Sequence, residues 1–260
     1  METLHFERYE YKYLVPAERT DEIRRFIRPY VQLDDHAACS PDRRYTIHNV
    51  YLDTPNFDLY GASIRDDVDR FKLRIRWYDG DLKGPFFCEV KRKIRQVIIK
   101  DRARISRSDF DAIVSGRTVS IADESSADNL TAFQDRVVRT GAIPLLCSCY
   151  EREPYESAFG EYSRITIDHA MCYQMIAGGE FHEDPDAWTY VDGAWATNGI
   201  PCAALIELKF TRNFPRWMSD LVSEFDLVRC GYSKFVNSVK HHLGSSCGGM
   251  DFQRHATLNG

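Results

Sequence analysis

Residues 70–77 read RFKLRIRW, a run in which each cation is followed by a large apolar residue. Side chains of a β-strand point alternately to its two faces, so this run predicts a strand with one basic and one apolar face. The basic face carries four cations and no acid: Arg70, Lys72, Arg74 and Arg76. We therefore expect the apolar face to be buried, while the basic face meets either water or an anion.

The same alternation recurs further along the chain. Residues 91–104 carry seven cations against one acid, Asp101. An ordinary solvated face explains such a pattern on one strand, but solvated faces normally mix charges because like charges on adjacent strands repel. If these strands are neighbours, their cations converge on an anion-binding surface, and a closed barrel would make it a basic tunnel. Arginine forks and lysine point charges at this density favour phosphate.

The whole chain is nevertheless acidic. Its 260 residues include 34 Lys+Arg and 39 Asp+Glu, a formal charge of −5, and 43% are hydrophobic. This composition excludes a disordered protein and a generically basic coat for nucleic acid. No secretory h-region or membrane-spanning stretch is evident, and the eight cysteines form no C-x-x-C motif. We expect reduced thiols in a cytoplasmic protein, with a zinc site as a minor alternative.

Periodicity and turn residues predict a single α+β domain over residues 1–243, followed by a flexible tail at 244–260. It is built on an antiparallel sheet or barrel with helices packed outside. Strands are expected at residues 6–15, 44–53, 69–79, 85–93, 96–106, 145–153, 162–169, 171–176 and 203–210. Helices are expected at residues 16–32, 54–63, 106–114, 129–139, 214–228 and 233–242, and residues 178–200 form a hairpin or long loop.

Three carboxylates share the basic faces: Glu10, Glu89 and Glu207. Each is either a salt-bridge partner for the cations or an oxygen ligand for Mg²⁺ or Mn²⁺. The chain lacks a P-loop, a kinase signature set and a nucleophile elbow. Phosphoryl transfer would therefore depend on positioning and charge neutralisation rather than on a covalent nucleophile.

Eight segments in order resemble the catalytic domain of VTC polyphosphate polymerases, a branch of the CYTH or triphosphate tunnel metalloenzyme superfamily. They are FERYEYKY (6–13), VYLDTPNFDLY (50–60), KLRIRWY (72–78), PFFCEVK (85–91), YER (150–152), RITID (164–168), LIELK (205–209) and YSKF (232–235). The resemblance implies an eight-stranded antiparallel barrel around a basic tunnel. It also implies transfer of the ATP γ-phosphate to a polyphosphate chain with Mn²⁺ or Mg²⁺.

The resemblance also implies roles for individual residues. Arg74, Arg76, Lys91 and Lys234 would form the catalytic set. Phosphates would further contact Lys12, Arg152, Arg164 and Ser233, and either Lys100 or Arg102 would supply another tunnel cation. Tyr150 would contact the nucleotide base, and Glu207 would hold the metal. The basic faces add Arg8 and Lys209 to the phosphate-binding set and Glu89 to the metal ligands.

One departure concerns the superfamily signature E-x-E-x-K, which here reads Arg8-Tyr9-Glu10-Tyr11-Lys12. The missing first acid matches the VTC branch, favours a single metal ion and weakens a hydrolase interpretation. The alternatives are a tunnel triphosphatase that hydrolyses inorganic or organic triphosphate, and a non-catalytic polyphosphate or nucleotide sensor. The expected partners are ATP and polyphosphate, not nucleic acid, and any coupling to a membrane would need a partner protein.

Overall fold

The computed structural model describes residues 8–246, except residues 80, 81, 83, 96, 161, 180, 183, 198 and 212. The side chains of residues 8, 124, 125, 245 and 246 also lie outside the description. Eight long strands run through it: β1 (Arg8–Pro16), β3 (Tyr45–Asp53), β4 (Asp69–Tyr78), β5 (Phe86–Ile94), β6 (Val97–Ile105), β7 (Ile143–Ser157), β8 (Ser163–Met175) and β10 (Ala203–Thr211). Two short strands, β2 (Val31–Leu33) and β9 (Thr189–Tyr190), pair with β7 and β8.

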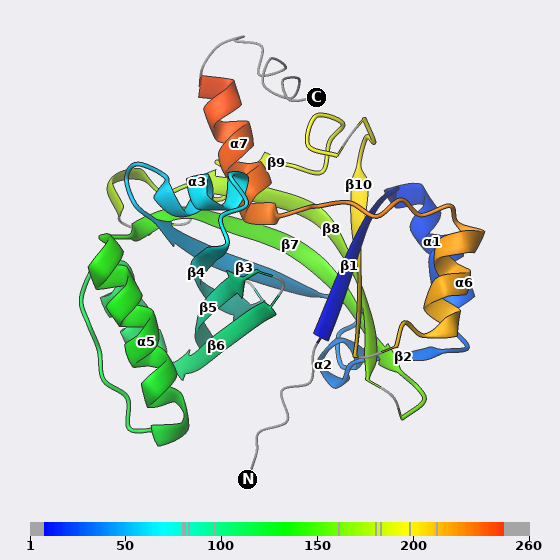
Figure 1. The fold of residues 1–260 in the computed structure, drawn as a ribbon, viewed down its shortest axis with the longest axis horizontal. Coiled ribbons are helices and arrows are strands. Elements are labelled where there is room, and N and C mark those ends of the chain that lie inside the picture. Colours follow the sequence, from blue (N-terminus) through cyan, green and yellow to red (C-terminus); the bar gives the residue numbers. More distant parts are fainter. Residues whose placement is uncertain are drawn as a thin grey trace.

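The long strands form one antiparallel sheet in the order β1-β10-β8-β7-β3-β4-β5-β6, which curls on itself (Figure 1). The expected α+β fold with eight antiparallel strands is thus confirmed. The sheet is an open half-barrel rather than a closed tunnel, since no ladder joins the described residues of β6 to β1. Lys91 Nζ on β5, the strand next to the β6 edge, lies 3.7 Å from Glu10 Oε1 on β1, so side chains of these two strands approach each other across the opening.

The hairpin of β7 and β8 corrects one expectation. The strands predicted at 162–169 and 171–176 are a single strand, β8. The register of the β7–β8 ladder shifts between Cys149 and Glu151 of β7. Ala170 of β8 lies opposite this shift and has a φ of 48°. An extra residue in one strand bends and twists the sheet without ending the strand.

The helices are α1 (Thr20–Ile27), α2 (Asp35–Ala38), α3 (Asp58–Ile64), α4 (Arg107–Val114), α5 (Glu124–Thr140), α6 (Arg216–Glu224) and α7 (Lys234–Ser246), with 3₁₀ turns at Ala17–Arg19 and Ala177–Gly179. The helix predicted over 16–32 is too long. It ends at Ile27, because Pro29 has no backbone N–H with which to continue the helical hydrogen bonds, and residues 31–33 become β2.

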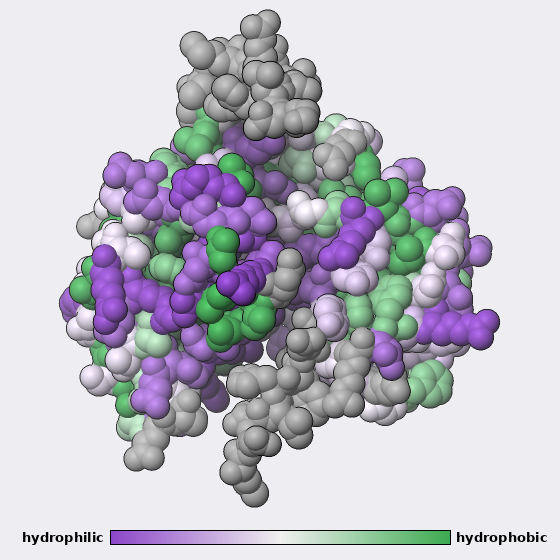
Figure 2. All heavy atoms as spheres, viewed as in Figure 1, coloured by the Kyte–Doolittle hydropathy of each residue, from purple (hydrophilic) through white to green (hydrophobic). Residues whose placement is uncertain are grey.

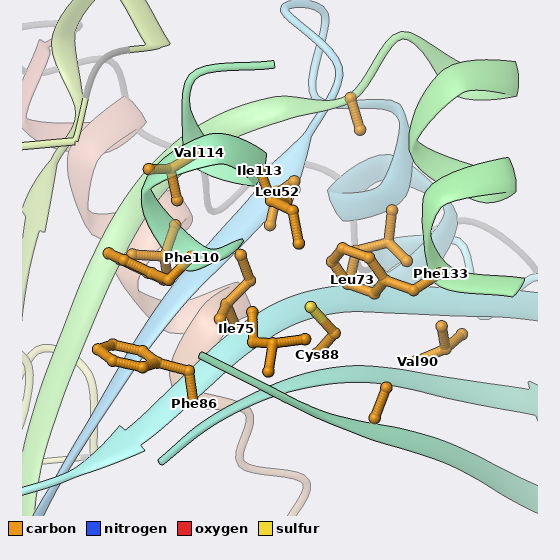
Figure 3. Close-up of a cluster of buried hydrophobic side chains, with 14 of the residues drawn as sticks. Leu52, Leu73, Ile75, Phe86, Cys88, Val90, Phe110, Ile113, Val114 and Phe133 are labelled. Carbon is orange, nitrogen blue, oxygen red and sulfur yellow. The ribbon is translucent and has the colours of Figure 1, made fainter. Parts of the chain in front are cut away.

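The apolar faces of the strands are covered from outside. Leu73, Ile75 and Trp77 of β4 are fully buried in a cluster that includes residues of α4 and α5. Figure 3 shows Phe110 of α4 above Phe86, and their rings stack with centroids 4.6 Å apart. On the opposite side of the molecule, α1 and α6 cover β1, β8 and β10 (Figure 1). Burial of these faces turns the charged faces toward the concave side of the sheet.

Candidate functional site

The inner face of the half-barrel is organised in rows that cross β4, β5 and β6. The register places Lys72 opposite Lys91 and Lys91 opposite Lys100. The next row is Arg74, Glu89 and Arg102. Figure 2 shows hydrophilic side chains around the recess at the centre of this face of the molecule. Lys100 and Arg102 therefore both lie on the inner face of the half-barrel.

Glu89 is held between two arginines. Arg74 Nε donates to Glu89 Oε2 at 2.6 Å, and Arg102 Nε lies 3.4 Å from Glu89 Oε1. Burial by itself would raise the pKa of Glu89, but Arg74, Arg76 and Arg102 together lower it to about 2. Arg102 also stacks on the Phe87 ring, 3.6 Å from its centroid. Both oxygens of Glu89 are thus engaged by cations and the carboxylate stays ionised.

A second cluster lies where β1 pairs with β10. Lys12 Nζ is 3.2 Å from Glu10 Oε1 and 3.2 Å from Glu207 Oε1, so one ammonium bridges two carboxylates. Glu207 Oε2 lies 2.7 Å from Lys209 Nζ and 3.5 Å from Arg152 Nη2. Burial would raise the pKa of Glu207, but the surrounding cations hold it well below its usual value.

Asp168 on β8 centres a third cluster, which sequence reasoning did not assign to the site. Arg152 binds it through two bonds, Nε to Oδ1 at 2.6 Å and Nη2 to Oδ2 at 2.7 Å, and Lys234 of α7 donates to Oδ2 at 2.6 Å. In the sequence, the alternation along this strand places Asp168 on the same face as Arg164, and this pattern could have indicated that Asp168 belongs to the site. Its partners come from β7 and α7, and these contacts cannot be read from local alternation.

Tyr150 lies under this cluster. Lys234 Nζ is 4.2 Å and the Arg152 guanidinium 5.3 Å from its ring centroid, and Arg76 Nη2 is 3.3 Å from its hydroxyl. Only 3% of the residue is exposed. Burial opposes ionisation, but Arg76, Arg152 and Lys234 lower the pKa of Tyr150 below its ordinary value.

The remaining expected site residues lie toward the ends of the inner face. Arg164 contacts Asp34 Oδ2 at 3.4 Å and Glu156 Oε1 at 3.2 Å. Ser233, directly before α7, accepts a hydrogen bond from Lys72 Nζ at 2.8 Å. Arg8 pairs with Thr211 through the backbone, and its side chain lies outside the described part of the chain. Lys72 itself belongs to the inner face although it was not among the expected site residues.

The interior remains partly open to water. The exposed side-chain fraction is 20% for Arg74, 33% for Lys91 and 7% for Glu207. In the ranges that the structure describes, no three His, Cys, Asp or Glu side chains are grouped closely enough to enclose a metal ion. Two carboxylates, Glu10 and Glu207, share one ammonium. Any divalent ion here would need phosphate or water oxygens to complete its coordination.

No helix among the described residues is both long and apolar enough to cross a membrane.

The chain resembles known proteins over most of its length. The VTC domain model matches residues 7–243. Vacuolar transporter chaperone complex subunit 2 of Schizosaccharomyces pombe is 23% identical over 227 residues, which covers 73% of this chain and 30% of that protein. The chain thus spans about 30% of that relative's length. The solved PH1819 protein of Pyrococcus horikoshii OT3 aligns with 91% of this chain and 99% of its own, at 13% identity and a TM-score of 0.42. The family match over nearly the whole described chain shows that this protein belongs to the VTC domain family.

Proposed function

We propose that this chain is a metal-dependent polyphosphate polymerase that transfers the γ-phosphate of ATP to a growing inorganic polyphosphate chain inside the half-barrel. The observation that carries the proposal is the row of Lys72, Lys91 and Lys100, which stand opposite one another on adjacent strands. Several phosphates in a row suit such a surface, whereas one carboxylate ligand would leave most cations without a counter-charge. Membership of the VTC family supports a polyphosphate-related function.

The proposed chemistry depends on positioning and charge neutralisation. The triphosphate is aligned by Arg74, Arg76, Lys91 and Lys234. A terminal oxygen of the polymer forms a bond to the γ-phosphorus, while the bond from that phosphorus to the β–γ bridging oxygen breaks and ADP leaves. The attacking oxygen already carries negative charge at neutral pH, so the scheme needs no general base.

The rest of the inner face binds the other phosphates in this proposal, and Tyr150 contacts the base. Asp168 and Glu89 act by positioning, since each holds two cations in place. The proposed phosphate-binding residues are Arg8, Lys12, Lys100, Arg102, Arg152, Arg164, Lys209 and Ser233.

A divalent ion, Mn²⁺ or Mg²⁺, is proposed at Glu207, with Glu10 as the neighbouring carboxylate. Such an ion supplies charge neutralisation at the phosphates. Mg²⁺ is usually bound through one or two carboxylates together with phosphate oxygens and waters, which two carboxylates and a triphosphate can provide. Glu89 is the other metal ligand expected from the sequence, but Glu207 is assigned first because it has a second carboxylate, Glu10, beside it on the same Lys12 ammonium.

The test is the product formed from labelled ATP and Mn²⁺, separated on a gel that resolves long anionic polymers. The wild type should make polymer, and Arg74→Ala and Glu207→Ala should each lower its yield by about 10²-fold or more, because each removes charge placed at the transferred group. Lys240→Ala is the matched control, since Lys240 is exposed on α7 and lies over the Trp195 ring. Circular dichroism verifies that each variant is folded. Undiminished synthesis by either site variant would sink the proposal.

The same assay separates the alternatives. Free phosphate without polymer would indicate a tunnel triphosphatase. Tight binding of tripolyphosphate with no turnover at any metal concentration would indicate a sensor. The S. pombe relative is named as a subunit of a complex. We propose that this chain likewise works with a partner protein, and in the cytoplasm, where ATP is available.

A further inference from the structure

Lys72 occupies an unusual position among the inner cations. It faces Lys91 directly across the β4–β5 ladder, and Lys100 stands beyond Lys91 on β6. Like charges directly opposite one another on neighbouring strands are destabilising. Lys91 has a nearby acid, because Glu10 Oε1 of β1 lies 3.7 Å from its ammonium.

The surroundings of Lys72 differ from those of Lys12, Arg74 and Lys234. The charged groups that face it are Arg70 and Arg74 on its own strand, Lys91 on β5 and Lys12 on β1. From the α7 side it meets the Ser233 hydroxyl at 2.8 Å and the Phe235 ring at 5.8 Å. Within the described part of the chain, no carboxylate oxygen lies within salt-bridge distance of its ammonium. Lys12, Arg74 and Lys234, by contrast, each contact an acid.

Such a site disfavours a cation when no ligand is bound. Burial and the four neighbouring cations lower the pKa of Lys72 to about 7. The neutral amine loses no hydrogen bond, because it can accept the Ser233 hydroxyl proton instead of donating to its oxygen. A bound anion would reverse this preference, since a negative charge within a few ångströms favours the protonated amine.

We propose that Lys72 is a further phosphate-binding residue of this site, which takes up a proton when a phosphate chain binds and thereby makes binding depend on pH near neutrality. The proposal rests on the proposed function in taking a phosphate chain as the ligand. In this proposal the Lys72 amine becomes a positively charged ammonium when the anion binds, and it then serves as a counter-charge for the phosphate chain. Ser233 orients the amine in both states, and the Phe235 ring limits its movement on the α7 side.

The expected change of anion affinity with pH follows from the pKa of Lys72. A group with a pKa of about 7 is about 90% protonated at pH 6 and about 3% protonated at pH 8.5. If only the protonated form binds tightly, the apparent affinity for the anion falls about 30-fold over that range. The sign follows from the raised pKa in the complex, because binding is strongest where Lys72 is already protonated and weakens as pH rises through 7.

The experiment uses the whole chain and tripolyphosphate without metal or ATP, followed by titration calorimetry at pH 6, 7, 8 and 8.5. Lys72→Arg keeps a permanent cation at this position. Between pH 6 and pH 8.5, the wild-type affinity for tripolyphosphate should therefore fall about 30-fold relative to the affinity of Lys72→Arg. Calorimetry at pH 8 in buffers of different ionisation enthalpy should show the wild type taking up close to one proton more than Lys72→Arg. Ionisation of the ligand is the same for both proteins and cancels in the comparison.

Two further variants keep the result interpretable. Lys72→Met removes the titrating group at similar length, so its affinity at pH 6 should fall toward that of the wild type at pH 8.5. Lys240→Arg, on the exposed side of α7, should leave the wild-type profile unchanged. Parallel pH profiles for the wild type and Lys72→Arg, with equal proton uptake, would overturn the proposal.

This experiment is separate from the test of the proposed function. If tripolyphosphate binds with the Lys72-dependent proton uptake but ATP yields no polymer, the polymerase assignment fails while the Lys72 proposal stands. If polymer forms and the proton uptake does not depend on Lys72, the opposite holds.

Discussion

At the scale of single residues, the inner face balances two requirements. The cations must remain together without a ligand, and they must be available to one. Glu89 illustrates the balance, because it neutralises Arg74 and Arg102 where a polyanion would otherwise do so. Carboxylates of this kind stabilise the empty protein and compete with the anion.

This balance predicts that Glu89→Gln lowers the stability of the protein but raises its affinity for a polyanion. Loss of the carboxylate leaves the partly buried Arg74 and the exposed Arg102 without this counter-charge, so the free energy of unfolding should fall by about 1–3 kcal/mol. Affinity for tripolyphosphate should rise, because one competing negative charge has gone. Urea unfolding and calorimetry measure the two effects.

Glu151→Gln is the matched control for that variant. Glu151 is 45% exposed and pairs with a partly exposed Arg44, so the change should stay within about 0.5 kcal/mol. A Glu89→Gln protein that loses both stability and anion affinity would contradict the idea of competition.

At the scale of elements, the buried carboxylate of Glu153 joins a helix to the sheet. Glu153 of β7 accepts two hydrogen bonds from Arg24 of α1, each at 2.8 Å, and lies 2.9 Å from His169 Nε2. Burial would raise the pKa of Glu153, but these partners lower it to about 2. The contact fixes α1 against the outer surface of the half-barrel.

The lowered pKa gives a pH dependence of stability. A depressed carboxyl pKa stabilises the fold above the unfolded value of about 4.5, and the contribution is lost as the pH falls toward 2. Glu153→Gln should therefore lower stability at pH 7 by about 1–3 kcal/mol and flatten the loss of stability between pH 4.5 and 3. Urea unfolding at several pH values provides the measurement. Asp21→Ala, which removes the exposed partner of the same Arg24, should change little.

Local sequence patterns predicted the helices and strands better than they predicted the contacts between side chains of different elements. Alternation in residues 70–77 identified both faces of β4, because the period of a strand does not depend on its neighbours. It could not show that Lys12 faces Glu207 or that Lys234 meets Asp168, since those contacts depend on pairings between distant segments. The overlong first helix has a local cause, because the apolar spacing at Val31 continued past a proline that ends the helix.

At the scale of the whole molecule, the charge of −5 and the basic interior are compatible. The concave face gathers cations from seven strands, while many acids lie on outer surfaces, such as Asp21, Asp67 and Asp111. An acidic exterior repels bulky polyanions at a distance, and the interior attracts a thin one at short range. The arrangement favours a single phosphate chain over a nucleic-acid duplex.

This selectivity predicts a specific competition result. Tripolyphosphate binding should weaken about tenfold between 50 and 200 mM NaCl, because salt screens the interior cations that remain open to water. Duplex DNA at equal phosphate concentration should change the apparent affinity by less than about twofold. Displacement of tripolyphosphate by DNA would place the binding surface on the exterior instead.

The pairing of the first long strand with the last has a consequence for biosynthesis. Lys12 and Glu207 are opposite each other on β1 and β10 although they are about 195 positions apart in sequence. At roughly 5–20 residues per second, a ribosome needs about 10–40 s to make the intervening chain. During that time β1 waits without its partner, and its edge is open to pairing with other chains. Nascent chains of this protein are therefore most vulnerable to aggregation before β10 emerges, and fragments that lack either end would contain no complete site.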